Sequence, residues 1–352
     1  MRNWVSMMSV KIVKINGKNE YDKLTEPAKM LADGKLVAFP TETVYGLGGN
    51  ALCGETVKKI YEAKGRPSDN PLIVHIAKKE DVYRIAKDVP PAAEKILETL
   101  CPGPITFVVE KSDLVPDEVT AGGKTVAIRM PEHETARELI LRAGVPVAAP
   151  SANLSGKPSP TTAKDVFEDM EGRIPMLIDG GDCEVGVEST VVDMTRKPAM
   201  ILRPGGVTRE MMEEVIGQVE VHQAILAPLA SDAQAASPGM KYKHYAPKAR
   251  VRIITGDRAA ERICELYDAA KQEGVSTVIF SVSQEETLFG DREFYAWGDD
   301  LSDVAHHLFS ALRMADEKGY ALVLCHSVDT DGVGLAVMNR LVRAAGFDIE
   351  EA

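Results

Sequence analysis

The order of apolar and polar positions along the chain predicts alternating strands and helices. A short apolar run at 36–39 is typical of a buried strand, and Pro40 ends it because proline offers no N–H to a sheet. Val57, Ile60 and Tyr61 have the spacing of one helix face, and Gly65 ends that helix. The same patterns predict strands at 11–15, 72–76, 105–110, 125–129, 145–149, 176–178 and 199–202, and helices at 19–32, 55–63, 80–87, 92–100, 132–142, 208–216 and after Thr162.

The second half of the chain has a different rhythm. Periodicity is lost between 217 and 248, where Ala, Ser, Pro and Gln are frequent, and this segment is predicted as a linker. Strands then alternate with helices from 249 to 352, which indicates a small parallel-sheet domain. We therefore expect an α/β protein with a larger domain at 1–216, a linker at 217–248 and a smaller Rossmann-like domain at 249–352.

The end of the predicted linker has an unusual composition. Residues 237–247 are basic and aromatic inside an acidic protein, which a plain spacer does not require. Our hypothesis is that this segment acts as a lid over the N-terminal site, with Lys241 or Lys243 near phosphates.

Small polar and basic residues gather where the N-terminal strands are predicted to end. Polar groups at strand ends around a twisted sheet commonly line a ligand crevice, although each could instead be a turn residue or a cap. No matching histidine–aspartate arrangement accompanies the serines, so we interpret these residues as binding groups and not as nucleophiles. They are Arg129, Ser151, Asn153, Ser189 and Arg203.

The stretch from 39 to 75 combines hydroxyl, glycine and basic residues. Several hydroxyls follow the strand at 36–39, and Gly46, Gly48 and Gly49 are expected to allow a sharp turn or a close approach to a ligand. Lys64 and Arg66 leave the next helix together, and such a basic fork suits a polyphosphate. The hydroxyls could be turn formers and the cations could complement the helix dipole. Both features within forty residues favour a site.

Residues 46–51 also match the dinucleotide fingerprint G-x-G-x-x-A. That fingerprint belongs in a strand-to-helix turn and needs an acid at the end of the next strand. Here six residues separate the strand from Gly46, and the strand at 72–76 ends in Ala-Lys-Lys. A nicotinamide cofactor is therefore disfavoured.

Composition narrows the function classes. The net charge of −12 disfavours broad non-specific binding of nucleic acid, although a local basic groove is still compatible with it. The five cysteines and seven histidines show no metal-ligand spacing, so we expect reduced thiols and no protein-built metal site. We expect no membrane span, and no signal peptide because Lys11 and Lys14 interrupt the only candidate. The expected compartment is the cytoplasm.

The motifs taken together resemble the two-domain threonylcarbamoyl-AMP synthases, which are built on a YrdC-like domain. The likeness spans nearly the whole chain and its motifs are highly specific in combination. They stand at 39–48, 64–67 with 70–75, 150–156, 188–193, 203–205 and 237–247. The resemblance implies a twisted mixed sheet with helices and a concave site in the N-terminal domain.

The resemblance also implies a reaction. L-Threonine, bicarbonate and ATP give threonylcarbamoyl-AMP and pyrophosphate, and a transferase complex then moves the threonylcarbamoyl group to an adenosine beside the tRNA anticodon. The implied catalytic cations are Lys64 and Arg66, and magnesium enters with ATP. The implied threonine contacts are Thr43, His75, Arg129, Ser151 and Ser189. The implied ATP contacts are Arg66, Asn70, Thr125, Asn153, Thr161, Arg203 and Tyr245, with Lys64 beside the phosphates and Tyr245 stacked on adenine.

Two other functions stay open at this point. An RNA-binding module would use the basic concave face of a YrdC-like fold, and a salt-sensitive RNA shift without ATP turnover would favour it. A carbamoyl-handling maturation protein is the other, but those relatives carry zinc-finger segments and no C-x-x-C is present here. The role of the C-terminal domain, including contact with tRNA, cannot be read from the sequence.

Overall fold

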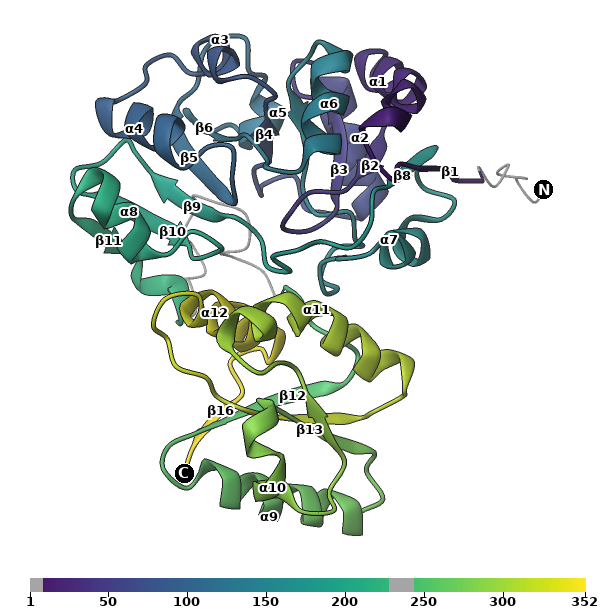
Figure 1. Cartoon of the computed structure of the whole chain (residues 1–352), viewed down its shortest axis with the longest axis vertical. Coiled ribbons are helices and arrows are strands. Elements are labelled where there is room, and N and C mark those ends of the chain that lie inside the picture. The colour runs from purple at the N-terminus through teal and green to yellow at the C-terminus, as the bar shows by residue number, and fades with distance from the viewer. Residues whose placement is uncertain (1–8, 228–243) are drawn as a thin grey trace.

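The computed structural model describes residues 9–227 and 244–352, which form a larger N-terminal unit and a smaller C-terminal unit (Figure 1). The N-terminal unit is built on a mixed sheet in the order β1-β8-β2-β3-β7-β4-β6-β5-β9-β10-β11. Its strands are β1 Lys11–Lys14, β2 Val37–Phe39, β3 Gly46–Asn50, β4 Ile73–His75, β5 Ile105–Glu110, β6 Thr125–Arg129, β7 Val147–Ala148, β8 Met176–Asp179, β9 Thr190–Asp193, β10 Ala199–Arg203 and β11 Val219–Val221.

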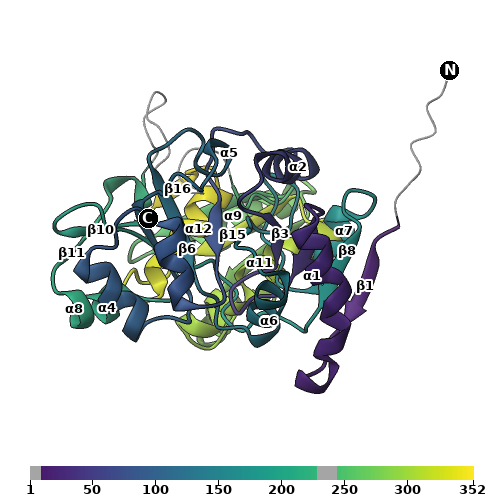
Figure 2. The same ribbon diagram turned by 90° about the horizontal axis from the view of Figure 1, so that it is seen from above.

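Helices cover this sheet and leave polar strand ends for a site. Helix α1 packs beside α6, and α4 beside α8, at opposite ends of the unit (Figure 2). The helices are η1 Lys18–Leu24, α1 Thr25–Ala32, α2 Gly54–Lys64, η2 Lys79–Asp81, α3 Val82–Ile85, α4 Pro91–Thr99, α5 Asp117–Thr120, α6 Glu134–Ala143, α7 Ala163–Met170, α8 Arg209–Ile216 and η3 Gln223–Ile225.

Most expected elements of this unit are present, and the strands at 105–110 and 125–129 have the predicted bounds. The predicted helix at 19–32 is instead the 3-10 helix η1 followed by α1. Pro27 lies in the first turn of α1, the part of a helix where a missing N–H is tolerated. Thr162 caps α7 through a capping box with Asp165, as the sequence indicated.

The glycine-rich stretch is the clearest correction. Gly46, Gly48 and Gly49 were expected to allow a sharp turn or a close approach to a ligand, but Gly46–Asn50 does not turn and is strand β3 in the middle of the sheet, paired with β2 and β7. A Cβ at Gly48 would come within 2.7 Å of the Phe39 ring and 2.8 Å of the Val147 side chain. The glycine therefore serves close packing against neighbouring side chains, and the match to a dinucleotide fingerprint does not lie in a strand-to-helix turn.

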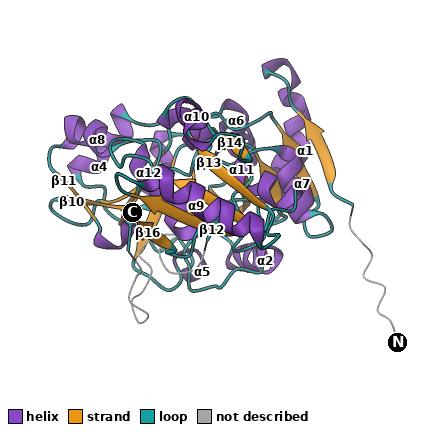
Figure 3. Cartoon of the chain, turned by 90° about the horizontal axis from the view of Figure 1, so that it is seen from below, coloured by secondary structure: helices purple, strands orange, loops and turns teal. Residues whose placement is uncertain are grey.

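The C-terminal unit is a five-stranded sheet in the order β14-β13-β15-β12-β16, and every pairing in it is parallel (Figure 3). This confirms the predicted parallel-sheet domain, although strand β16 was not predicted. Its elements are β12 Arg250–Thr255, α9 Ala259–Gln272, β13 Thr277–Ser281, η4 Ser283–Glu285, α10 Glu286–Phe289, β14 Phe294–Ala296, α11 Leu301–Glu317, β15 Leu322–His326, α12 Gly334–Ala344 and β16 Ile349–Glu351.

The two units share a hydrophobic core. Helices α11 and α12 lie between the C-terminal sheet and the N-terminal unit, while α9 and α10 lie on the far side of that sheet (Figure 1). Val44 and Val187 of the N-terminal unit belong to the same buried cluster as Phe309 and Leu341 of these helices. In the described parts of the chain, no helix combines the length and the apolar character that crossing a bilayer requires.

Candidate functional site

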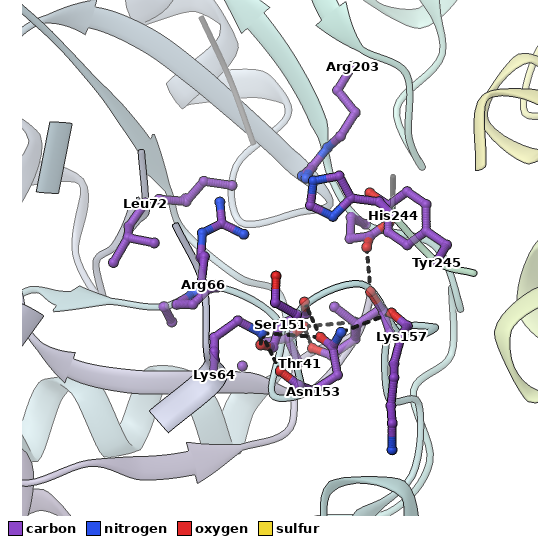
Figure 4. A pocket seen from close by; sticks show the side chains of 18 of the residues that line it. Thr41, Lys64, Arg66, Leu72, Ser151, Asn153, Lys157, Arg203, His244 and Tyr245 are labelled. Atoms are coloured by element: carbon purple, nitrogen blue, oxygen red, sulfur yellow. Dashed lines mark hydrogen bonds between the residues drawn. The ribbon is translucent and has the colours of Figure 1, made fainter. Parts of the chain in front are cut away.

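A cavity of about 730 Å³, counting the space at its mouth, opens where several strands of the N-terminal sheet end. Arg66 and Leu72 stand on one side of it and His244 and Tyr245 on the other (Figure 4). The basic and polar groups that line it suit an anionic ligand.

Strands β4 and β6 bring two of the predicted residues together. His75 and Arg129 are register partners in this parallel pair, so both reach the same strand end. Arg129 Nη2 donates to Glu42 Oε1 at 2.6 Å, and both side chains are buried. Arg129 Nε and Glu42 Oε2 have no hydrogen-bond partner within the described residues. A buried donor without a partner is costly, which is consistent with a ligand that supplies one.

The charges of this pair and of His75 follow from burial. Burial acts to raise the pKa of Glu42, but the charge and hydrogen bond of Arg129 outweigh it and hold the pKa below its usual value. Burial, assisted by the Arg129 charge, lowers the pKa of His75 to about 3. The imidazole is therefore neutral. Its Nδ1 lies 3.2 Å from the Ile73 carbonyl oxygen, so in the tautomer that donates from Nδ1 the acceptor nitrogen is Nε2.

Lys64 ends helix α2 inside the cavity wall. Its Nζ donates to the carbonyl oxygens of Ser151 at 2.5 Å and Asn153 at 2.6 Å, and to Asn153 Oδ1 at 3.3 Å. Burial and the nearby Arg66 charge lower the pKa of Lys64 well below its ordinary value. Lys64 thus ties the 151–153 segment to the end of α2.

Arg203, the last residue of β10, binds Ser189 through its guanidinium. Its Nε and Nη2 donate to the Ser189 carbonyl at 3.1 and 2.9 Å, and Nη2 also reaches Ser189 Oγ at 3.1 Å. Thr106 Oγ1 lies 2.8 Å from the same Oγ. Burial lowers the pKa of Arg203 to about 10, so the guanidinium still carries its charge at neutral pH. Ser189 is positioned by two neighbours, Arg203 and Thr106, rather than left as a free hydroxyl.

Tyr245 lines the cavity from the far end of the predicted linker. Its ring packs against Phe309 of the C-terminal unit, with ring centroids 5.1 Å apart, and against His244 at 5.6 Å. Its φ of 65° is unusual for a bulky residue, so the surrounding contacts fix this conformation. Residues 237–243, including Lys241 and Lys243 of the lid hypothesis, lie outside the described residues.

The structure brings most, but not all, of the expected residues to the cavity. The expected residues that line it are Lys64, Arg66, His75, Arg129, Ser151, Asn153, Arg203 and Tyr245. The expected residues that are not part of the lining are Thr43, Asn70, Thr125, Thr161 and Ser189. Thr43 and Ser189 contact lining residues directly, since Thr43 Oγ1 lies 2.9 Å from Thr41 Oγ1 and Ser189 accepts from Arg203.

Sequence reasoning missed several lining residues. Glu188 is the most informative of them, because it is a buried carboxylate in the cavity wall. The available signal in the sequence was its position directly before Ser189, a predicted site residue. His244 stood in the basic, aromatic end of the linker. The other missed polar residues are Thr41, Ser155, Lys157 and Ser159.

The cavity suits anions better than a metal cation. Its charged lining consists of Lys64, Arg66, Arg129, Lys157 and Arg203, together with the carboxylate of Glu188. Within residues 9–227 and 244–352, no group of three or more His, Cys, Asp or Glu side chains is placed to hold a metal ion.

Comparisons with known proteins agree over nearly the whole chain. Residues 29–205 match a family described as Telomere recombination, and residues 207–346 match the threonylcarbamoyl-AMP synthase C-terminal domain. The chain is 47% identical to the threonylcarbamoyl-AMP synthase of Pyrococcus abyssi, over 96% of this chain and 98% of that one. Identity to the Bacillus subtilis threonylcarbamoyl-AMP synthase is 44%, over 92% and 93%.

A solved structure is similar to both units at once. The crystal structure of P. abyssi Sua5 complexed with L-threonine superposes with a TM-score of 0.92 at 46% identity, covering 97% of this chain and all of that one (100%). The similarity therefore includes the arrangement of the C-terminal unit against the N-terminal one.

Proposed function

The chain belongs to the two-domain threonylcarbamoyl-AMP synthases, and on that premise we propose that its cavity joins L-threonine, bicarbonate and ATP into threonylcarbamoyl-AMP and pyrophosphate. The enzyme is accordingly a nucleotidyltransferase that acts in tRNA modification. The observation that carries the proposed chemistry is the cluster of cations around one cavity, since the carboxylate of threonine and the phosphates of ATP are both anionic.

The threonine end of the cavity is assigned to Arg129 and His75. The unpartnered Nε of Arg129 would donate to the threonine carboxylate, and the neutral His75 ring would accept from the threonine amine or hydroxyl. Ser151, Ser189 and Thr43 would supply the remaining polar contacts. A neutral imidazole is useful here, because it adds no positive charge beside an amine that must react as a nucleophile.

The reaction needs no nucleophile from the protein. The threonine amine adds to bicarbonate and water leaves, which gives a carbamate. A carbamate oxygen then attacks the α-phosphorus of ATP, and the bond to the β-phosphate breaks to release pyrophosphate. Catalysis is therefore mainly positioning together with stabilisation of developing negative charge. Lys64, Arg66 and Arg203 are proposed for that stabilisation.

The nucleotide end is assigned to Arg66, Asn153, Arg203 and Tyr245 of the lining, with Asn70, Thr125 and Thr161 behind it. ATP is proposed to arrive as its magnesium complex, since the cavity's carboxylate, Glu188, is already committed to an arginine. Bound magnesium would add positive charge at the phosphates.

The product is a reactive mixed anhydride, and we propose that a tRNA threonylcarbamoyl-transferase complex consumes it in the cytoplasm. All five cysteines lie in described ranges and are free thiols, which supports a reducing compartment. We assign the catalytic unit to 1–216, the linker to 217–248 and the C-terminal unit to 249–352, and the linker range begins with strand β11, which pairs with β10 and extends the N-terminal sheet.

Pyrophosphate release by the purified chain tests the proposed function. Release from ATP is expected to require both L-threonine and bicarbonate, with threonylcarbamoyl-AMP detected by mass spectrometry. Release at equal rate without an amino acid would contradict the proposal. Binding of tRNA in a salt-sensitive way without any ATP turnover would favour an RNA-binding role instead.

A further inference from the structure

Two arginines of the C-terminal unit reach into the walls of the cavity. Arg340 of α12 is 0% exposed and Arg313 of α11 is 9% exposed, although both lie at the contact between the units. Burying an arginine is costly unless its charge and donors are satisfied, and an apolar side chain would serve simple packing as well. The partners of these two arginines therefore indicate what they do.

Arg340 is bound to the segment that precedes strand β9. Its Nε donates to Glu188 Oε2 at 3.0 Å and its Nη2 to the Glu188 carbonyl at 3.2 Å, while Nη1 donates to the Pro204 carbonyl. Burial acts to raise the pKa of Glu188, but the charges of Arg340 and Arg203 outweigh it and hold the pKa below its usual value. Glu188 is thus an ionised wall residue of the cavity whose nearest counter-charge comes from the other unit.

The same segment, residues 184–189, contacts the C-terminal unit at further points. His306 Nδ1 lies 2.8 Å from the Glu184 carbonyl oxygen. Gly186, with a φ of 78°, approaches α11 so closely that a Cβ would collide with the His306 backbone. Val187 is fully buried in the hydrophobic cluster of the C-terminal unit. The segment that carries Glu188 and Ser189 therefore rests on α11 and α12.

Arg313 binds a second segment of the cavity wall, residues 157–159. Its Nη2 donates to the Pro158 carbonyl at 2.7 Å and to Asp169 Oδ2 at 2.8 Å. Asp169 also accepts from the cavity residue Lys157 at 2.8 Å. The Lys157 carbonyl in turn accepts from Asn153 Nδ2 at 2.9 Å. Arg313 is thereby connected to the segment 157–159 and to the asparagine assigned to the nucleotide.

The two walls are joined to each other inside the cavity. Ser159 Oγ donates to Glu188 Oε1 at 2.6 Å, and both residues line the cavity. We propose that Arg313 and Arg340 are positioning residues of the active site, through which the C-terminal unit fixes the segments 157–159 and 184–189. This inference rests on the proposed function, because the first segment is connected to ATP through Asn153 and the second to threonine through Ser189.

Steady-state pyrophosphate release by the full-length protein tests the proposal with Arg340→Met and Arg313→Met. Arg340→Met is expected to raise the threonine KM by about tenfold or more, with a smaller effect on the ATP KM. Arg313→Met is expected to raise the ATP KM more than the threonine KM. In the double variant Glu188→Gln/Arg340→Met, the loss should be less than the two single losses combined, because the two residues act as one pair.

Glu317→Gln is the matched control. Glu317 pairs with Lys164 across the same contact at 2.9 Å, but this pair is exposed and does not touch the cavity. It should leave both KM values unchanged, because exposed ion pairs contribute little. Arg340→Lys, which keeps the charge but not the fork, should lie between wild type and Arg340→Met.

The opposite view is that the arginines only stabilise the contact between the units. Variants that melt at lower temperature but keep the wild-type KM values for both substrates would overturn the proposal. If Arg340→Met does not fold, Arg340→Lys and Glu188→Gln decide, and an unchanged threonine KM in both overturns it. A wild-type protein without threonine-dependent turnover would instead refute the proposed function.

Discussion

The guanidinium of Arg129 and the carboxylate of Glu42 form a 2.6 Å ion pair in which both side chains are 4% exposed. The pair neutralises the arginine charge before any substrate is present, yet it leaves Arg129 Nε and Glu42 Oε2 without partners among the described residues. An arginine that is already oriented by one carboxylate can receive a second one with little loss of side-chain entropy.

Arg129→Ala should therefore raise the threonine KM by a factor that corresponds to about 2–5 kcal/mol. Glu42 is then left buried and unpaired, and the substrate carboxylate loses its donor. The measurement is pyrophosphate release as a function of threonine at saturating ATP. The ATP KM should change far less. Equal changes in the two KM values would argue against Arg129 as the residue that binds the threonine carboxylate. Glu42→Gln is the companion variant, because it removes the ion pair but keeps the Arg129 donor.

Serine should be a poorer substrate than threonine. It lacks one methyl group, and a missing methyl or methylene in a fitted pocket costs about 1–3 kcal/mol in kcat/KM. The two amino acids are compared in the same pyrophosphate assay at limiting concentrations. Indistinguishable kcat/KM values would mean that the threonine methyl is not recognised.

Tyr245→Ala should weaken ATP binding by about 1–3 kcal/mol, the contribution of stacking one base on an aromatic ring. Calorimetric titration with ATP measures the effect, and threonine binding should be altered less. Tyr245→Phe keeps the ring and should bind ATP as the wild type does. Phe309→Leu removes the ring packed on Tyr245 from the C-terminal side, so it separates loss of packing from loss of stacking. An ATP affinity that Tyr245→Ala leaves unchanged would contradict the assignment.

The stability of the protein should fall as the pH decreases from about 6.5 to about 5. Burial lowers the pKa of both His75 and His244 to about 3 in the folded protein, against 6.5 in an unfolded chain. Below pH 6.5 the unfolded chain binds protons that the fold excludes, so the free energy of unfolding decreases by about 1.4 kcal/mol per pH unit for each histidine.

Urea denaturation at several pH values measures this dependence. The buried carboxylates Glu42 and Glu188 are not expected to add to the slope here, because their arginine partners hold their pKa values below the usual one, which already lies below this range. His75→Asn should flatten the slope by the share of one histidine. A slope that the substitution leaves unchanged would mean that His75 is protonated inside the fold.

The sequence predicted the strands and helices well where a residue type has a single common structural use at its position. The apolar run before Pro40 became β2, and Thr162 capped α7. The prediction failed at Gly48, because glycine is used both in turns and where a strand lies against bulky side chains, and only the positions of Phe39 and Val147 distinguish the two.

The candidate site was predicted where residues belong to compact motifs, such as Lys64 with Arg66 or Ser151 with Asn153. It was not predicted where partners are far apart in the chain. Nothing near Glu188 indicates that an arginine 152 residues later will neutralise it. Likewise, the motif containing Arg129 does not reveal that Glu42, 87 residues earlier, already occupies part of its fork. Such pairings depend on how whole units pack.

The place of Arg340 in the chain also bears on when the enzyme becomes active during its synthesis. Domains generally fold in order as they leave the ribosome, the N-terminal one first. Arg340 follows Glu188 by 152 residues, so the catalytic unit emerges while Glu188 still lacks its nearest counter-charge. If Arg340 positions the site as proposed, nascent chains that lack α12 would carry an incomplete site, and activity would begin only once that helix has emerged and docked.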